Sequence, residues 1–249
     1  MPIDPPRSKI LSVGRARLEA QLKAGRSPEH VFVHIPKTGG SSVERALTLI
    51  AKAGGRPPTR FPPMIDLDAA EELAPDARFV CVLRDPLERL ISAFNSRLRQ
   101  GRPRYHSPWR PAEATVFAHY RRVEAFLDGL LSDDPFDVSM ADFAFSQIGH
   151  LKRGYAFYFG DAEAAARRAE RFALIGEMDR MEAFFAELLK LSKAPATLLP
   201  EIAPPVHAAP ERARAIVAAL GEEKTARLRR RLAGEYAVHD RLSALSGPR

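Results

Sequence analysis

Residues that could bind a phosphate group gather in one short stretch of the sequence, His34-Ile-Pro-Lys-Thr-Gly-Gly-Ser-Ser42. An apolar run at 31–35 precedes the glycines and a helical pattern follows them, which predicts a turn between a strand and a helix. Two adjacent glycines let the backbone approach an anion closely, and a helix start offers free N–H groups and a positive dipole. Because Lys37 precedes the glycines, the pattern differs from the nucleoside-triphosphate P-loop. The stretch therefore predicts a cradle for another phosphate ligand.

A second strand, turn and helix follow at 78–94. The continuous apolar run at 79–83 is typical of a strand buried on both faces. Asp85 and Pro86 are a helix cap and a first helical residue. Arg84 then lies at the end of the strand, and Ser92 lies two helical turns further on. Together these two side chains could clamp one phosphate group from two sides.

Both segments resemble motifs of the sulfotransferases that use 3'-phosphoadenosine 5'-phosphosulfate (PAPS). The first segment is similar to their 5'-phosphosulfate loop, and the second to their 3'-phosphate motif. The residues of both motifs are most similar to the branch of heparan and uronyl 2-O-sulfotransferases and its bacterial relatives. Weaker similarity to this branch occurs at 145–151, 174–184 and 235–242. The resemblance implies that Arg84 and Ser92 hold the 3'-phosphate. It also implies that the 5'-phosphosulfate is bound by the loop residues Pro36, Lys37, Thr38, Gly39, Gly40, Ser41 and Ser42.

The resemblance implies in-line transfer of a sulfuryl group to an acceptor hydroxyl, with PAPS as donor and 3',5'-ADP as product. Lys37 is the candidate for meeting charge on the departing phosphate oxygen. Asp66 and His106 are the candidates for the base that removes the hydroxyl proton. His34 is a further alternative, although packing at a strand end is its simpler interpretation. The histidines show no paired ligand spacing, so no metal is expected.

The acceptor is indicated by residues 97–110, in which arginines alternate with Tyr105, His106 and Trp109. Aromatic rings stack on sugars, and guanidinium groups pair with carboxylates or sulfates. A carbohydrate or glycan acceptor is therefore expected, and an exposed loop without a ligand is the alternative. A kinase-like phosphotransferase and a non-catalytic binder of acidic glycans also remain open. No nucleic-acid motif accompanies the loop.

The composition is that of a globular protein. The 249 residues carry a formal net charge of +7, which favours anionic partners. Cys81 is the only cysteine, so an internal disulfide is impossible and a reducing compartment fits. The sequence shows neither a signal peptide nor a membrane-spanning segment. A bacterial cytoplasmic enzyme is expected, whereas the oligomeric state is left undetermined.

The expected fold class is α/β, a three-layer, P-loop-like fold with a central, mainly parallel sheet flanked by helices. Residues 1–29 are expected to form a basic extension that packs on a single domain at 30–249. Strands are predicted at 31–35, 79–83 and 173–176, with an extended piece near 59–61. Residues 194–210 are predicted to be a proline-rich excursion. Helices are predicted at 42–53, 66–73, 112–131, 139–151, 161–171, 179–192, 209–220 and 222–233.

Overall fold

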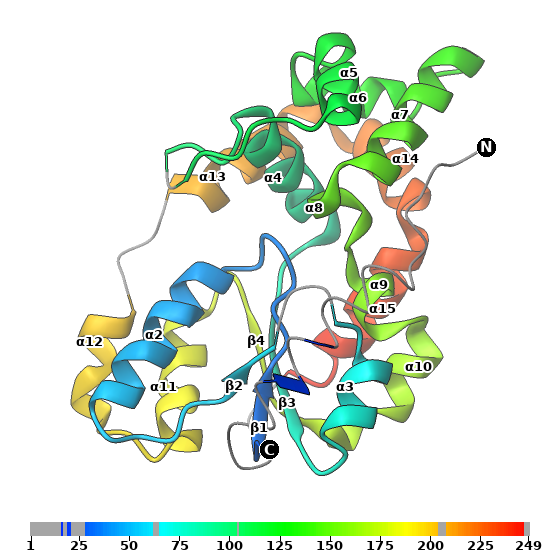
Figure 1. The fold of residues 1–249 in the computed structure, drawn as a ribbon. Helices are drawn as coiled ribbons and strands as arrows, with labels where there is room; N and C mark the ends of the chain where they lie inside the picture. The colour runs from blue at the N-terminus through cyan, green and yellow to red at the C-terminus, as the bar shows by residue number, and fades with distance from the viewer. Residues whose placement is uncertain are drawn as a thin grey trace.

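The computed structural model describes residues 16, 19–20, 28–61, 65–103, 105–203 and 208–246. Its centre is a four-stranded sheet in the order β2-β1-β3-β4, and every pairing in it is parallel (Figure 1). The strands are β1 (His30–Phe32), β2 (Thr59–Arg60), β3 (Arg78–Leu83) and β4 (Phe172–Glu177). The predicted parallel α/β sheet is thus confirmed.

Helices cover both faces of this sheet (Figure 1). Phe32, Val80 and Val82 pack against α2 (Gly40–Lys52) and α11 (Met181–Leu191) on one face. The alternate residues Phe79 and Cys81 pack on the other face, against α3 (Leu67–Leu73), α9 (Tyr155–Phe159), α10 (Ala162–Arg167) and α15 (Ala233–Ser243). Because side chains alternate along a strand, a strand with two apolar faces requires these two layers of helices.

The chain order creates a switch point between β1 and β3. From β1 the chain passes through α2 to β2 at the edge, and then returns through α3 to β3 on the other side of β1. The loops after β1 and β3 therefore leave the sheet in opposite directions, at neighbouring carboxyl ends. In open parallel sheets this is the position where ligands bind.

A second group of helices lies beyond the carboxyl ends of the strands (Figure 1). It begins with α4 (Pro86–Leu98), which follows β3 directly, and has its own apolar core around Leu90, Phe94 and Phe126. Its other members are α5 (Pro111–His119), α6 (Val123–Gly129), α7 (Pro135–Gln147), α8 (Gly149–Lys152), α13 (Ala208–Leu220) and α14 (Glu222–Arg231).

Several predicted boundaries are wrong. The helix predicted at 112–131 is two helices, α5 and α6, separated at Tyr120, whose backbone leaves the helical region and whose hydroxyl donates to the carbonyl of Asp137. The helix predicted at 139–151 begins earlier, at Pro135, because Asp134 caps it, and ends before a separate turn, α8. The predicted excursion at 194–210 contains α12 (Leu199–Ile202) and the start of α13.

Two further predictions concern the amino-terminal segment and the location of the protein. The expected packing of residues 1–29 on the domain falls almost entirely outside the described residues. Among the helices that are described, none is long and apolar enough to cross a membrane. The cytoplasmic location stays a prediction.

Candidate active site

The loop between β1 and α2 has the shape expected for an anion cradle. Lys37 and Gly39 both have left-handed backbone conformations, with φ of 73° and 83°. The Thr38 hydroxyl donates a hydrogen bond of 3.0 Å to the carbonyl of Ile35 and so braces the turn. Gly39 caps α2 without a side-chain hydrogen bond to the helix, and the first turn carries no acidic residue. The first N–H groups of α2 are thus available for a ligand.

Close packing requires glycine at position 40, and the left-handed φ of 83° favours glycine at position 39. A Cβ atom on Gly40 would lie 2.0 Å from Nε2 of His34, and one on Gly39 would lie 3.0 Å from Sδ of Met178. The ring of His34 is held there by Glu44, whose Oε1 lies 2.8 Å from Nδ1. The contact with His34 is the main reason why the pKa of Glu44 is lowered. His34 therefore supports the loop from behind, in agreement with its interpretation as a packing residue.

Arg84 lies at the carboxyl end of β3 and is almost fully buried. Its main chain is fixed by Tyr155, whose hydroxyl accepts from the Arg84 amide at 2.7 Å and donates to the Arg84 carbonyl at 2.6 Å. Burial lowers the pKa of the guanidinium, and the neighbouring Glu88 opposes that shift. The guanidinium remains a cation because an arginine side chain does not lose its proton in proteins.

The side chain of Arg84 joins the two predicted motifs. Nε donates to Glu88 at 3.3 Å, and Nη1 donates to the main-chain carbonyl of Lys37 at 3.4 Å. Nη2 is buried and has no hydrogen-bond partner within the described part of the chain. A buried donor without a partner is costly unless a ligand completes it. The site therefore fits an anionic group that contacts Arg84 beside the loop of Lys37.

Helix α4 carries the second motif, and its start matches the prediction. The Asp85 carboxylate accepts hydrogen bonds from the amides of Leu87 and Glu88 at 2.9 and 3.0 Å, with Pro86 at the first helical position. Asp85 also accepts from the Tyr236 hydroxyl at 2.9 Å. Asp85 is thus a structural cap, while Ser92 lies half-buried further along the same helix.

The side chain of Arg89 contacts two other helices, and its buried Nε has no hydrogen-bond partner among the described residues. Arg89 follows Asp85 by four positions, a spacing that suggests either an ion pair with Asp85 or a ligand contact. Instead, its Nη1 donates to the carbonyl of His150 at 3.0 Å, and its Nη2 lies 3.5 Å from Glu235. Arg89 therefore connects α4 to α8 and α15.

The two candidates for the general base have local contacts. Asp66 is buried and accepts a hydrogen bond of 3.0 Å from the amide of Ala69 as the cap of α3. His106 is exposed, and its Nε2 lies 2.8 Å from the amide oxygen of Gln100. Neither contact tests a catalytic role, so both assignments stay proposals.

The loop at 97–110 is tied to the helical group at both ends. Arg97 is buried, donates to both carboxylate oxygens of Glu113 at 2.9 and 2.7 Å, and accepts from the Trp109 indole at its carbonyl. Arg97 and Trp109 therefore hold the loop, whereas Arg102 and Arg110 are exposed. Arg104 lies outside the described residues.

His150 is a candidate that the sequence alone did not reveal. Its Nδ1 is buried and has no hydrogen-bond partner among the described residues. Burial, together with the positive charges of Lys37, Arg153, Arg97 and Arg89, lowers its pKa to about 3. The imidazole is therefore neutral at physiological pH. The one available signal is the weaker similarity at 145–151, which does not by itself single out a histidine.

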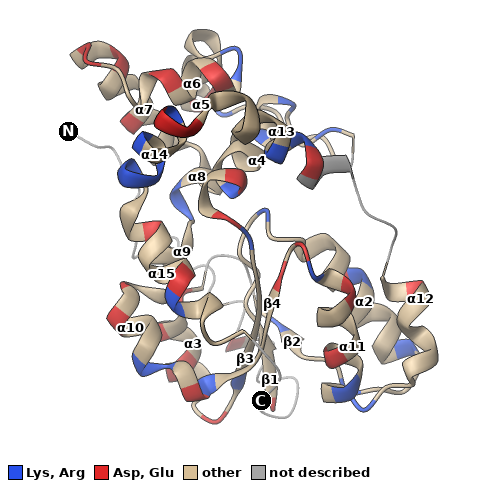
Figure 2. Cartoon of the chain, turned by 180° about the vertical axis from the view of Figure 1, so that it is seen from behind, with Lys and Arg blue, Asp and Glu red and all other residues tan. Residues whose placement is uncertain are grey.

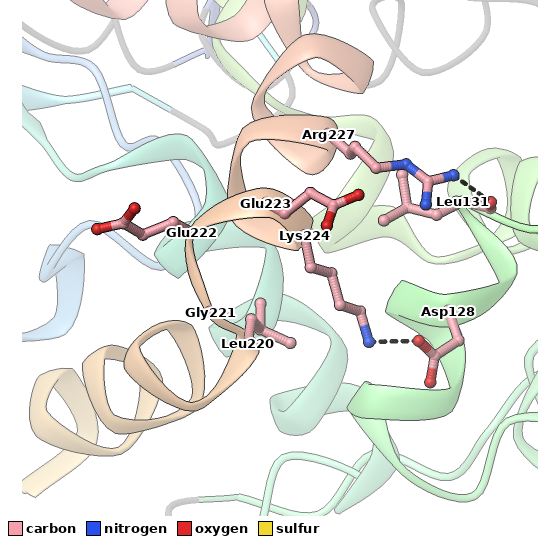
Figure 3. A pocket seen from close by; sticks show the side chains of 8 residues that line it. All are labelled: Asp128, Leu131, Leu220, Gly221, Glu222, Glu223, Lys224 and Arg227. Carbon is pink, nitrogen blue, oxygen red and sulfur yellow. Dashed lines mark hydrogen bonds and ion pairs between the residues drawn. The ribbon is translucent and has the colours of Figure 1, made fainter.

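A surface hollow of about 420 Å³ lies away from these residues, between α6 and α14 (Figure 3). Lys224 pairs with Asp128 across it, and Arg227 donates to the carbonyl of Leu131 at 3.0 Å. None of the predicted site residues lines this hollow.

Two other features of the surface do not add to the site. Helix α14 is strongly basic (Figure 2), but its Arg229 and Arg231 pair with Asp85 and Asp142. In the described residues, no group of three or more His, Cys, Asp or Glu side chains could hold a metal ion.

A parallel α/β sheet with a glycine turn at its switch point is the arrangement at which phosphate groups bind in open α/β folds. Comparison with known proteins narrows the class of protein. The model of a family described as "Sulfotransferase family" matches residues 21–158, which is more than half of the 249 residues. The chain belongs to the sulfotransferase family. Searches of the curated proteins and of the solved structures gave no match.

Proposed function

We propose that this protein is a PAPS-dependent sulfotransferase that moves a sulfuryl group to a hydroxyl of a carbohydrate or glycan. The observation that carries the proposal is the buried Nη2 of Arg84, which has no hydrogen-bond partner among the described residues and belongs to a guanidinium bonded to the loop of Lys37. A buried guanidinium with a free N–H group fits an anionic oxygen such as that of a phosphate. The 3'-phosphate of PAPS would supply the missing partner.

In this proposal each of the two motifs binds a different part of the donor. Residues Thr38 to Ser42 would bind the 5'-phosphosulfate mainly through backbone N–H groups, since α2 begins without a side-chain cap. Arg84 and Ser92 would bind the 3'-phosphate. When bound, PAPS would supply the activated sulfuryl group.

Catalysis would then depend on positioning and charge stabilisation. Lys37 has a left-handed backbone conformation, with φ of 73°. This conformation is costly for a residue other than glycine, so the surrounding structure must hold it in place. We assign to the Lys37 ammonium the role of neutralising the departing phosphate oxygen. Its positive charge is one of four that lower the pKa of His150, after burial as the main cause.

The general base has three candidates. Asp66 and His106 come from the sequence, and His150 is added because its buried Nδ1 has no hydrogen-bond partner among the described residues. Substitution of each in turn, Asp66→Asn, His106→Gln and His150→Gln, separates them. The base is the residue whose loss lowers kcat and removes the acidic limb of the pH profile while 3',5'-ADP still binds.

Transfer of labelled sulfate from PAPS to a panel of neutral and anionic glycans and small alcohols tests the whole proposal. We expect transfer to a glycan hydroxyl without added metal. Transfer of a phosphoryl group from ATP in a magnesium-dependent reaction would instead establish the kinase-like alternative. Binding of acidic glycans without any transfer would establish a non-catalytic binder.

A further inference from the structure

Glu88 lies in an unexpected place for a phosphate site. The Glu88 side chain is 15% exposed, and one of its carboxylate oxygens accepts a hydrogen bond of 3.3 Å from Nε of Arg84. The other oxygen receives the Nε of Arg214, from α13, also at 3.3 Å. A negative charge next to a phosphate repels it, so this carboxylate must either weaken the site or serve it in another way.

The contacts of Arg84 decide between these roles. A guanidinium has five N–H groups in a rigid fork. Glu88 engages Nε, the Lys37 carbonyl engages Nη1, and Nη2 has no partner among the described residues. An unrestrained arginine side chain would lose conformational freedom on binding, whereas one already fixed loses little. The fork is therefore oriented before any ligand arrives.

The position of Glu88 is itself fixed by α4. Its amide is bonded to the cap residue Asp85 at 3.0 Å, and Glu88 stands four residues after Arg84, the spacing at which side chains meet around a helix start. Arg214 shares the carboxylate and lowers the pKa of Arg84 in turn. Arg214 also lies 3.9 Å from Asp179, so the charges of the two guanidinium groups and the two carboxylates balance.

We propose that Glu88 is a positioning residue that sets the preference for nucleotides carrying a 3'-phosphate, because it holds Arg84 with Nη2 directed at that phosphate. The proposal rests on the proposed PAPS-dependent function. Glu88 itself touches neither donor nor acceptor and acts only through Arg84.

The sign of the effect distinguishes this role from simple electrostatics. Glu88→Ala removes a negative charge, so an effect through charge alone would tighten the binding of 3',5'-ADP. Loss of the orientation of Arg84 would weaken it. A purely structural role would weaken 3',5'-ADP and 5'-AMP alike.

Calorimetric titration of the full chain with 3',5'-ADP and with 5'-AMP tests the proposal. Glu88→Ala should weaken 3',5'-ADP binding about tenfold and change 5'-AMP binding less than about twofold. The matched control is Glu163→Ala, which removes the same charge from an exposed i,i+4 pair with Arg167 on α10. It should leave both affinities unchanged.

Unchanged or tighter binding of 3',5'-ADP by Glu88→Ala would overturn the inference, as would equal weakening of both nucleotides. If Glu88→Ala does not fold, Glu88→Gln replaces it. The Gln oxygen can still accept from Nε, so a smaller loss of the same sign is expected, and a gain in affinity would contradict the proposal. If the wild type itself does not prefer 3',5'-ADP, then the proposed function fails before this inference is tested.

Discussion

The guanidinium of Arg84 donates a hydrogen bond of 3.4 Å to the main-chain carbonyl of Lys37, across 47 positions of the sequence. This contact joins the loop after β1 to the end of β3 at the switch point of the sheet. The guanidinium proposed for donor selection is therefore bonded to the main chain of the residue whose ammonium is proposed for catalysis. A shift of the main chain at Lys37 should therefore change the orientation of the Arg84 side chain.

Lys37→Ala should lower the turnover of sulfuryl transfer by about a hundredfold to a thousandfold, because one donor to the developing charge is lost. The affinity for 3',5'-ADP should change much less, since the lysine acts mainly in the transition state. Steady-state kinetics and calorimetry measure the two effects. Lys52→Ala, at the far end of α2, is the control. Turnover at the wild-type rate in Lys37→Ala would exclude the role assigned to this lysine.

Gly40→Ala should destabilise the fold by about 1–3 kcal/mol, because the new methyl group would overlap the ring of His34. Urea unfolding measures this loss. The double variant Gly40→Ala, His34→Ala should recover part of it, since the clash is then absent. Gly234→Ala is the control, because a Cβ atom there would meet open space. Equal stability of Gly40→Ala and the wild type would show that the loop does not pack on His34.

Stability should fall between pH 6.5 and pH 5 because of His150. Its folded pKa is lowered to about 3, so in this window the unfolded chain binds a proton that the folded protein does not. The free energy of unfolding should decrease by about 1–2 kcal/mol on going from pH 7 to pH 5. His150→Gln should show a smaller decrease than the wild type. A decrease caused by His30, whose pKa burial also lowers, should remain in both proteins. Parallel stability curves for the two proteins would mean that His150 is not a buried neutral group.

Replacing Arg102, Arg104 and Arg110 with Ala should raise the KM for an anionic acceptor and flatten its salt dependence, since fewer charges remain to be screened. The affinity for PAPS should hardly change. The control removes three exposed charges elsewhere, at Arg167, Lys190 and Arg230. An acceptor KM that the loop variant leaves unaltered at low salt would mean that this loop has no part in acceptor binding.

The sequence predicted the parts of this site that depend on neighbours along the chain. Both strand, turn and helix units were predictable because glycines, the Asp85 cap and the apolar runs act locally. The left-handed conformation of Lys37 was not, since it depends on the surrounding packing.

Contacts between distant residues could not be predicted from local patterns. Arg89 is paired with Glu235 and the carbonyl of His150 through the way in which α8 and α15 pack against α4. The sharing of Glu88 between Arg84 and Arg214 also depends on packing, here of α13 on α4. The start of α7 is a different case, because Asp134 and Pro135 form an ordinary cap and first-turn pair that the sequence does contain.

Titration of the wild type and of Arg84→Ala with 3',5'-ADP and 5'-AMP tests whether Arg84 binds the 3'-phosphate of the donor. The wild type should bind 3',5'-ADP far more tightly, and Arg84→Ala should lose most of that preference, a loss of about 1.5–3 kcal/mol. Arg78→Ala, an exposed arginine at the other end of β3, should keep the preference. Equal affinity of the wild type for the two nucleotides would contradict the account.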